Sequence, residues 1–231
     1  SEMCIRDRML PEWRKEMQSR RKLEGIDVSH WEGRIDFFEV RRAGIRIVYI
    51  KASEGDRGVD PDFERNYREA QTAGLKIGFY HYLTARTVEE GREQARHFAR
   101  VIREKHYEAC PVMDFESFGD LDREQINAVS LAFLRELETL TEKMVAVYSD
   151  ASNAANVFDE RLAFYPLWIA EYGVKRPEMN NDWREWAGWQ YTDAGRVRGI
   201  KGTVDRDYFT EKILADRSTV LRPRECPEED N

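Results

Sequence analysis

Two acidic residues two positions apart, Asp114 and Glu116, follow an apolar run and are well placed for proton transfer. The run Pro111-Val112-Met113 is typical of a buried strand, and side chains two apart on a strand point to the same face. Two carboxylates held side by side repel each other's charge, which raises the pKa of one and makes it a proton donor near neutral pH. Acids at strand ends often cap the turn and helix that follow, and the pair alone favours that role, so a catalytic role needs support from other residues.

Two further acids, Asp27 and Asp205, fall on the first and last of the strands predicted below. In a β/α barrel the chemistry takes place at the carboxyl ends of the strands, which meet at one mouth. Three strands that deliver acids to the same mouth favour catalysis over a purely structural role.

Aromatic residues lie near strand ends or on the late strands, where rings with a polar tip suit the faces of sugars. We expect Tyr80, Trp168 and Tyr172 to contact a substrate, with Tyr191 as a further candidate. Because side chains alternate along a strand, some of the late aromatic rings must instead fill the barrel core.

The elements that position these side chains alternate along the chain from Gly25 onward. Apolar runs bounded by turn residues predict strands at Gly25–His30, Ile45–Ala52, Lys76–Leu83, Cys110–Glu116, Met144–Ser149, Pro166–Glu171, Trp186–Tyr191 and Thr203–Asp207. Helical spacing and capping signals predict helices at Phe37–Ala43, Pro61–Ala73, Thr87–Lys105 and Asp122–Leu140, and a brief one after Asp150. Five β/α units and three further strands predict an α/β fold, an irregular TIM-like (β/α)5(β)3 barrel in a single domain.

The chain divides into three parts by this pattern. Residues 24–215 carry the barrel, residues 1–23 form an N-terminal extension, and residues 216–231 are expected to be a disordered C-terminal tail. The chain opens with Ser1 and shows no apolar signal-peptide core, so we expect a truncated or non-native start that hides any export signal.

Composition excludes several classes of protein. No stretch approaches the roughly 20 apolar residues of a membrane span. A formal net charge of −7 argues against a nucleic-acid binder, which would carry a basic face. The 3 cysteines imply no disulfide framework, and the 4 histidines lack metal-ligand spacing. We therefore expect a monomer with no metal and no cofactor, and with neither nucleic acid nor membrane as a partner.

Read together, the segments from Gly25 to about Leu214 resemble the glycoside hydrolase family 25 lysozymes, in motif and in order. The matching motifs are Gly25-Ile-Asp-Val-Ser29, Gly33, Lys51-Ala-Ser-Glu-Gly55, Asp60-Pro-x-Phe63, Asn66, Ala73-Gly-Leu75, Gly78-x-Tyr-His81, Asp114-x-Glu116, Leu167-Trp-Ile-Ala-x-Tyr172, Trp189-Gln-Tyr191 and Val204-Asp205. The resemblance implies an irregular barrel of five β/α units and three more strands, which agrees with the elements predicted from the pattern.

The resemblance also implies roles for the acids. Glu116 matches the general acid that protonates the leaving oxygen, and Asp114 matches its partner on the same strand. Asp27 and Asp205 match the two other acids of the mouth, which bind substrate and orient the first pair. Glu54 matches a further acid of the family, which we expect to contact substrate.

Members of the family hydrolyse the β-1,4 bond between N-acetylmuramic acid and N-acetylglucosamine in bacterial peptidoglycan, without a metal. An oxocarbenium-like transition state needs an acid at the leaving oxygen and negative charge near the anomeric carbon. The acetamido carbonyl of the substrate can itself supply that charge while Asp114 holds the acetamide N–H, and we expect this substrate-assisted route. The resemblance thus implies an enzyme that acts on peptidoglycan glycan strands, outside the cell or at the cell wall.

Three positions depart from the family pattern. Glu32 stands where Asn or Gln is usual, Gly58 replaces an aromatic residue or Leu, and Asp207 stands where Asn is common. We expect these positions to flank the cleft and to change its rim contacts and pH optimum.

Two other functions remain open from the sequence. A chitinase-like glycosidase would use the same acetamido assistance on a polymer that lacks the lactyl group. A non-catalytic wall-binding module would typically lose Glu116 or Asp114, and both are present.

Overall fold

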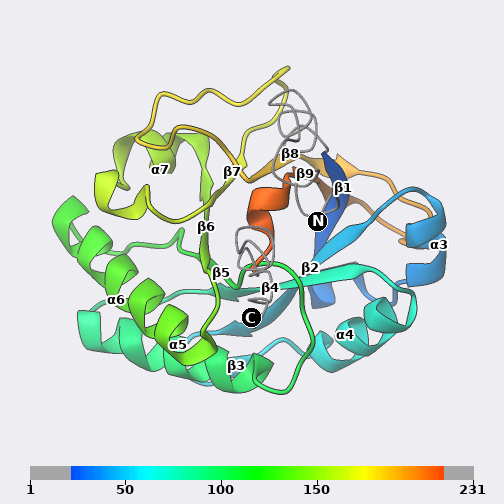
Figure 1. The fold of residues 1–231 in the computed structure, drawn as a ribbon, viewed down its shortest axis with the longest axis horizontal. Helices are drawn as coiled ribbons and strands as arrows, with labels where there is room; N and C mark the ends of the chain where they lie inside the picture. The colour runs from blue at the N-terminus through cyan, green and yellow to red at the C-terminus, as the bar shows by residue number, and fades with distance from the viewer. Residues whose placement is uncertain (1–21, 216–231) are drawn as a thin grey trace, which may run out of the picture.

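Apolar runs alternate with amphipathic stretches along most of the chain. In the computed structural model the apolar runs are the strands of a barrel, and the amphipathic stretches are the helices outside it (Figure 1). The structure describes residues 22–215. The predictions for the N-terminal extension before Lys22 and for the tail 216–231 therefore lie outside the described residues.

Every strand predicted from the sequence is present, with ends that differ by a few residues. The strands are β1 (Leu23–Val28), β2 (Ile47–Glu54), β3 (Gly58–Val59), β4 (Lys76–Tyr82), β5 (Val112–Asp114), β6 (Ala146–Asp150), β7 (Leu167–Ala170), β8 (Gly188–Gly195) and β9 (Val204–Phe209). The short β3, which the pattern did not predict, folds back antiparallel on β2.

Within residues 22–215 the strands form one 9-stranded sheet in the order β1-β9-β8-β7-β6-β5-β4-β2-β3, and a further pairing of β1 with β2 closes it. Since β3 is paired with β2 alone in this order, the other eight strands make the closed barrel. The predicted (β/α)5(β)3 barrel is confirmed.

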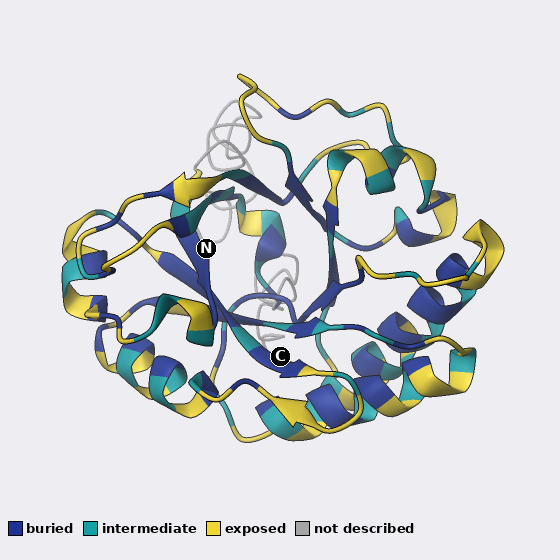
Figure 2. Cartoon of the chain, turned by 180° about the vertical axis from the view of Figure 1, so that it is seen from behind, coloured by how far each residue is buried: buried dark blue, intermediate teal, exposed yellow. Residues whose placement is uncertain are grey.

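Helices follow each of the first five strands of the barrel and cover its outside (Figure 1). The α-helices are α3 (Phe37–Arg42), α4 (Phe63–Thr72), α5 (Val88–Ile102), α6 (Arg123–Thr141) and α7 (Ala151–Asn156), and the short 3-10 helices are η1 (His30–Glu32), η2 (Glu160–Leu162) and η3 (Glu211–Ile213). Figure 2 shows the inner faces of the larger helices buried and their outer faces exposed, as their spacing predicts. In the described part of the chain, none of these helices is long and apolar enough to span a membrane.

One strand runs against the others. Strands β1, β2 and β4 to β8 are parallel to their neighbours in that series, whereas β9 is antiparallel to both β1 and β8. The beginning of β9 therefore lies at the mouth where the other strands end, and Asp205 pairs in register with Asp27. This reversal is what brings an acid from the start of a strand to the mouth.

Large rings fill the interior of the barrel below the mouth. Tyr49, Trp168 and Phe209 pack there, with Tyr49 stacked on Trp168 at 4.7 Å between ring centroids. Glycines on neighbouring strands make room for these rings, since a Cβ at Gly78 would lie 2.3 Å from the Tyr49 ring and one at Gly25 2.6 Å from Phe209. The rings form the solid floor on which the site is built.

The chain after β9 closes the far end of the barrel. The backbone N–H of Cys110, just before β5, donates to the Ile213 carbonyl of η3 at 2.8 Å. Ala215 N–H donates in turn to the Glu108 carbonyl at 2.9 Å. The mouth is therefore the open end of the barrel.

Candidate active site

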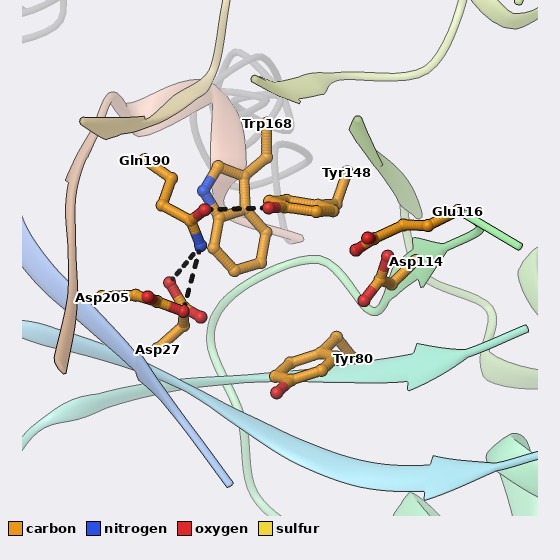
Figure 3. Close-up of a pocket in the computed structure, with 8 residues that line it drawn as sticks. All are labelled: Asp27, Tyr80, Asp114, Glu116, Tyr148, Trp168, Gln190 and Asp205. Atoms are coloured by element: carbon orange, nitrogen blue, oxygen red, sulfur yellow. Dashed lines mark hydrogen bonds between the residues drawn. The ribbon is translucent and has the colours of Figure 1, made fainter. Parts of the chain in front are cut away.

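A cavity of about 110 Å³ opens at the mouth of the barrel (Figure 3). Its lining combines acids, aromatic rings and one amide: Asp27, Tyr80, Asp114, Glu116, Tyr148, Trp168, Gln190 and Asp205. The four acids that the sequence singled out thus lie around one cavity, contributed by β1, β5 with the residues that follow it, and β9.

Asp114 and Glu116 form one side of this cavity, and Figure 3 shows their carboxyl groups next to each other. Asp114, the last residue of β5, is buried, whereas Glu116 is exposed. Phe115 between them is buried in the outer core, so the alternation of the strand continues past its end and directs both acids into the barrel.

The buried member of the pair has a raised pKa. Burial, the hydrogen bond to Glu116 and the charge of Glu116 raise the pKa of Asp114 well above its ordinary value, while Lys51 opposes this rise. No N–H or hydroxyl of the described residues donates to Asp114 Oδ1. The elevated pKa that the sequence predicted for one member of the pair belongs to the buried one.

A second acidic group faces this pair across the cavity (Figure 3). The Gln190 amide donates from Nε2 to Asp27 Oδ2 at 2.9 Å and to Asp205 Oδ2 at 3.4 Å. The hydroxyls of Tyr148 and Tyr172 both donate to Gln190 Oε1, the former at 2.8 Å. With both ends of its amide bonded, Gln190 holds the two carboxyl groups in a fixed orientation.

Burial and mutual repulsion keep the second group protonated. Desolvation raises the pKa of Asp27 well above its ordinary value, and the charge of Asp207 adds to the rise. Desolvation and the charge of Asp27 raise the pKa of Asp205 to about 9. At neutral pH at least one of these carboxyl groups is therefore protonated.

Asp207 lies beneath the cavity and not beside it. Its side chain is completely buried, and Trp168 donates its indole N–H to Asp207 Oδ1 at 2.9 Å. Desolvation raises the pKa of Asp207 to about 7, although its hydrogen bonds with Asp27 and Trp168 act in the opposite direction. The expectation that Asp207 flanks the cleft is wrong, because residues two apart on β9 share a face and Asp207 follows Asp205 into the barrel.

The predicted aromatic residues differ in position. Tyr80 lines the cavity, and Trp168 forms its floor with 2% of its surface exposed. Tyr172 stands at the edge, 44% exposed and bonded to Gln190. Tyr191 does not line this cavity but stacks on Tyr208 at 4.5 Å, because alternation on β8 turns Gln190 inward and its neighbour outward.

Glu54 also lies outside the cavity lining. It is exposed at the end of β2, and Lys51 Nζ donates to its carboxylate at 3.4 Å. Lys51 Nζ also lies 5.5 Å from the centroid of the Tyr82 ring, so Glu54 and Tyr82 are both neighbours of this lysine.

Two cavity residues, Tyr148 and Gln190, were missed from the sequence. Gln190 stands in the Trp189-Gln-Tyr191 motif, in which only the aromatic residues were predicted to contact substrate. On β8, however, Gln190 pairs in register with Asp207, one of the inward-facing residues of β9. Tyr148 pairs in register with both Asp114 and Trp168. Both neighbours face inward, so the alignment of the three strands would have predicted that Tyr148 lines the cavity.

The other two departures have local structural roles. Glu32 accepts the Ser29 backbone N–H at 2.8 Å and so caps η1, and burial raises its pKa. A Cβ at Gly58 would lie 2.5 Å from the Glu54 carbonyl oxygen, so the turn into β3 has no room for a side chain there. Neither residue lines the cavity, and their expected effect on rim contacts stays a prediction.

The polar residues near the site offer no set of metal ligands. Within residues 22–215, no group of three or more His, Cys, Asp and Glu side chains is arranged to hold a metal ion. His81 is buried behind the cavity between Ser53 Oγ at 2.8 Å and Gln94 Oε1 at 3.0 Å, and desolvation lowers its pKa to about 3. It is a packed, hydrogen-bonded residue.

Comparisons with known proteins agree with this geometry. The autolytic lysozyme of Clostridium acetobutylicum is 35% identical over 204 residues, which are 87% of this chain and 60% of that protein. Lysozyme M1 of Streptomyces globisporus is 33% identical over 200 residues, 81% of this chain and 67% of that protein. The crystal structure of the bacterial lysozyme from Streptomyces coelicolor superposes with a TM-score of 0.72 at 30% identity, covering 82% of this chain and 93% of that one.

The family match covers most of the barrel. The model of Glycosyl hydrolases family 25 matches residues 26–200, which run from β1 to the loop before β9. The matched range contains Asp27, Asp114 and Glu116, and Asp205 follows it by five residues. With its motifs, its barrel and its relatives in agreement, this chain belongs to the glycosyl hydrolases family 25.

Proposed function

We propose that this chain is a lysozyme-type muramidase, which hydrolyses the β-1,4 bond between N-acetylmuramic acid and N-acetylglucosamine in peptidoglycan. The observation that carries the proposal is buried Asp114, with its raised pKa, beside exposed Glu116 and opposite a second acidic group across one small cavity. We propose that Asp114 and Glu116 share one proton. The names of the relatives support the choice of substrate, since two of them are lysozymes.

The shared proton leaves through Glu116. Asp114 is enclosed by the barrel, so the exposed Glu116 is the member of the pair that reaches the glycosidic oxygen of a bound strand. As the C1–O bond breaks, the leaving oxygen takes the proton from Glu116, and the acetamido carbonyl oxygen of the same sugar bonds to C1. Asp114, ionised once the proton has gone, accepts the acetamide N–H and stabilises the cyclic cation.

In the second step, water attacks C1 and Glu116 acts as a base. Glu116, now a carboxylate, takes a proton from a water molecule while the water oxygen bonds to C1 and the acetamido oxygen leaves. Two successive displacements at C1 retain the β configuration of the sugar.

The opposite group orients the substrate. Gln190 fixes Asp27 and Asp205, and their raised pKa values leave carboxyl O–H groups that can donate to sugar oxygens at neutral pH. Tyr80 and Tyr172 offer ring faces and hydroxyls around the same sugar.

We further propose that the enzyme acts as a monomer on glycan strands at the cell wall or outside the cell. The cavity supports this, because one chain supplies all of the acids and rings around it. A binding module without activity would not need an acid pair with a shared proton at the centre of its cleft.

The proposal is tested by identifying which glycosidic bond is cut. Purified cell walls are digested, the new reducing ends are reduced with borohydride, and the fragments are identified by mass spectrometry. Muramitol-ended fragments are expected from the wild type and none from Glu116→Gln. Glucosaminitol ends alone would identify a glucosaminidase, and cleavage of chitin oligomers in preference to walls would support the chitinase-like alternative.

A further inference from the structure

An unusually exposed tryptophan stands beside the mouth. Trp31, in η1 directly after β1, has 82% of its surface exposed. Its neighbour Glu32 interacts electrostatically with Asp205 and Tyr80, which places η1 at the border of the cavity. Trp31 lies four residues after Asp27, so their Cα atoms are at most about 14 Å apart.

The backbone under this indole is fixed by a network of hydrogen bonds. Ser29 Oγ accepts the Trp31 backbone N–H at 3.2 Å, and Glu32 accepts the Ser29 backbone N–H at 2.8 Å, which completes a capping box. His30 Nδ1 lies 2.7 Å from Asp60 Oδ2, and the same oxygen accepts the His30 backbone N–H at 3.2 Å. Asp60 is buried, so it anchors η1 to the loop that follows β3.

One face of the indole is occupied and the other is free. The His30 ring lies against Trp31 at 4.6 Å between centroids, tilted by 35°. Because His30 is itself held by Asp60, the indole has a fixed support on one side. A side chain that is 82% exposed leaves its opposite face to solvent.

Exposed apolar side chains gather on the loops of the mouth. Val59 is 49% exposed on β3, and Tyr172 and Val174 are 44% and 37% exposed after β7. Together with Trp31 they follow the carboxyl ends of β1, β2 and β7. We call these four residues the apolar rim.

A glycan strand is longer than the cavity. The cavity of about 110 Å³ holds the sugar at the cleaved bond, so the neighbouring sugars of a polymer must lie over the surface around it. The hydrophobic C–H face of a pyranose ring fits against an aromatic face, and a ring that is already immobilised loses little entropy on binding.

We propose that Trp31 is a distal binding platform, on which a sugar of the same glycan strand stacks beyond the cavity. This inference rests on the proposed function, because it takes the polymer as the substrate. The free face of the indole binds the sugar, and the His30–Asp60 pair holds the ring in place from behind.

The test compares Trp31→Ala with Phe164→Ala on purified glycan strands of graded length. Phe164 is a matched control, since it is 74% exposed but lies before β7, at the closed end of the barrel. For Trp31→Ala we expect KM on long strands to rise about three- to tenfold with kcat unchanged, and KM on the shortest cleavable fragment to stay as in the wild type. Trp31→Phe keeps a ring and should recover most of the loss.

The outcomes separate this inference from the proposed function. A wild-type enzyme that cuts no glycan would contradict the proposed function and the platform together. Wild-type cleavage with the same KM on long strands for Trp31→Ala and Phe164→Ala would contradict the platform alone. An equal loss on short and long substrates would assign Trp31 a structural role and also overturn the inference.

Discussion

Asp114 and Glu116 lie two residues apart on one face, yet they differ in burial. Asp114 is enclosed, which raises its pKa, whereas Glu116 reaches the open cavity. In the proposed mechanism this difference in depth divides their roles: the buried acid retains the proton until a strand binds, and the exposed acid delivers it. Sequence spacing predicted the pair and its shared face, but not which member is buried.

Replacing the delivering acid should stop the reaction and leave the fold intact. Glu116→Gln is isosteric, and loss of a general acid costs on the order of 10²–10⁴ in rate. Turbidity of a cell-wall suspension measures the rate, and circular dichroism checks the fold. Lysis within a few-fold of the wild type would rule out the role given to Glu116.

The stereochemistry of the product tests the role of Asp114. In the assisted route the first product is the β anomer, and proton NMR of a fresh digest distinguishes it from the α anomer. Asp114→Asn should lose most of its kcat, because a neutral amide stabilises the cyclic cation less than a carboxylate does. An initial α product would mean direct attack by water.

Asp207 makes stability depend on pH. Its pKa rises to about 7 on folding, so the folded chain binds a proton that the unfolded chain has lost above its ordinary pKa near 3.8. The contribution of this group to stability is therefore most favourable below pH 3.8 and falls as pH rises toward 7, by on the order of 4 kcal/mol. In Asp207→Asn the amide oxygen can still accept the Trp168 N–H, but the residue no longer titrates, so it no longer makes stability depend on pH.

The measurement is the melting temperature of both proteins at pH 5 and pH 8. We expect Asp207→Asn to gain more over the wild type at pH 8 than at pH 5. An equal difference at the two values would show that Asp207 does not titrate between them.

At the scale of elements, alternation along the late strands decides which residues face the site. It turns Gln190 into the cavity and Tyr191 out to Tyr208, and it carries Asp207 in behind Asp205. The number and order of elements could be predicted because apolar periodicity and caps are local. The direction of β9 could not, since a single strand has the same pattern in either direction.

The glycines of the inner face are predicted to be structural. Gly78→Ala would set a Cβ 2.3 Å from the Tyr49 ring, and an overpacked core typically loses about 1–3 kcal/mol. The melting temperature should fall by several degrees, while kcat of the folded enzyme should change little. Gly202→Ala is the control, because nothing lies within 4 Å of a Cβ there. Similar melting temperatures for both variants would contradict the tight fit.

At the scale of the whole molecule, the hydrogen bonds of the barrel begin at Leu23 and end at Ala215. A chain trimmed to residues 22–215 keeps every strand pairing that the structure describes. We expect it to lyse cell walls at a rate within a few-fold of the full chain. Failure of the trimmed chain to fold would mean that residues beyond the strands contribute to the barrel.

The pairing of β1 with β9 also has a consequence for synthesis. Leu23 lies opposite Phe209, so the first strand cannot complete its ladder until almost the whole barrel sequence has left the ribosome. Contacts between such distant parts of a chain form late and slowly, because the long intervening loop must first be ordered. Asp205 meets Asp27 in that same step. Nascent and truncated chains that lack β9 therefore lack the pairing that brings Asp205 to Asp27, and we expect the proposed activity to arise only once β9 has joined the barrel.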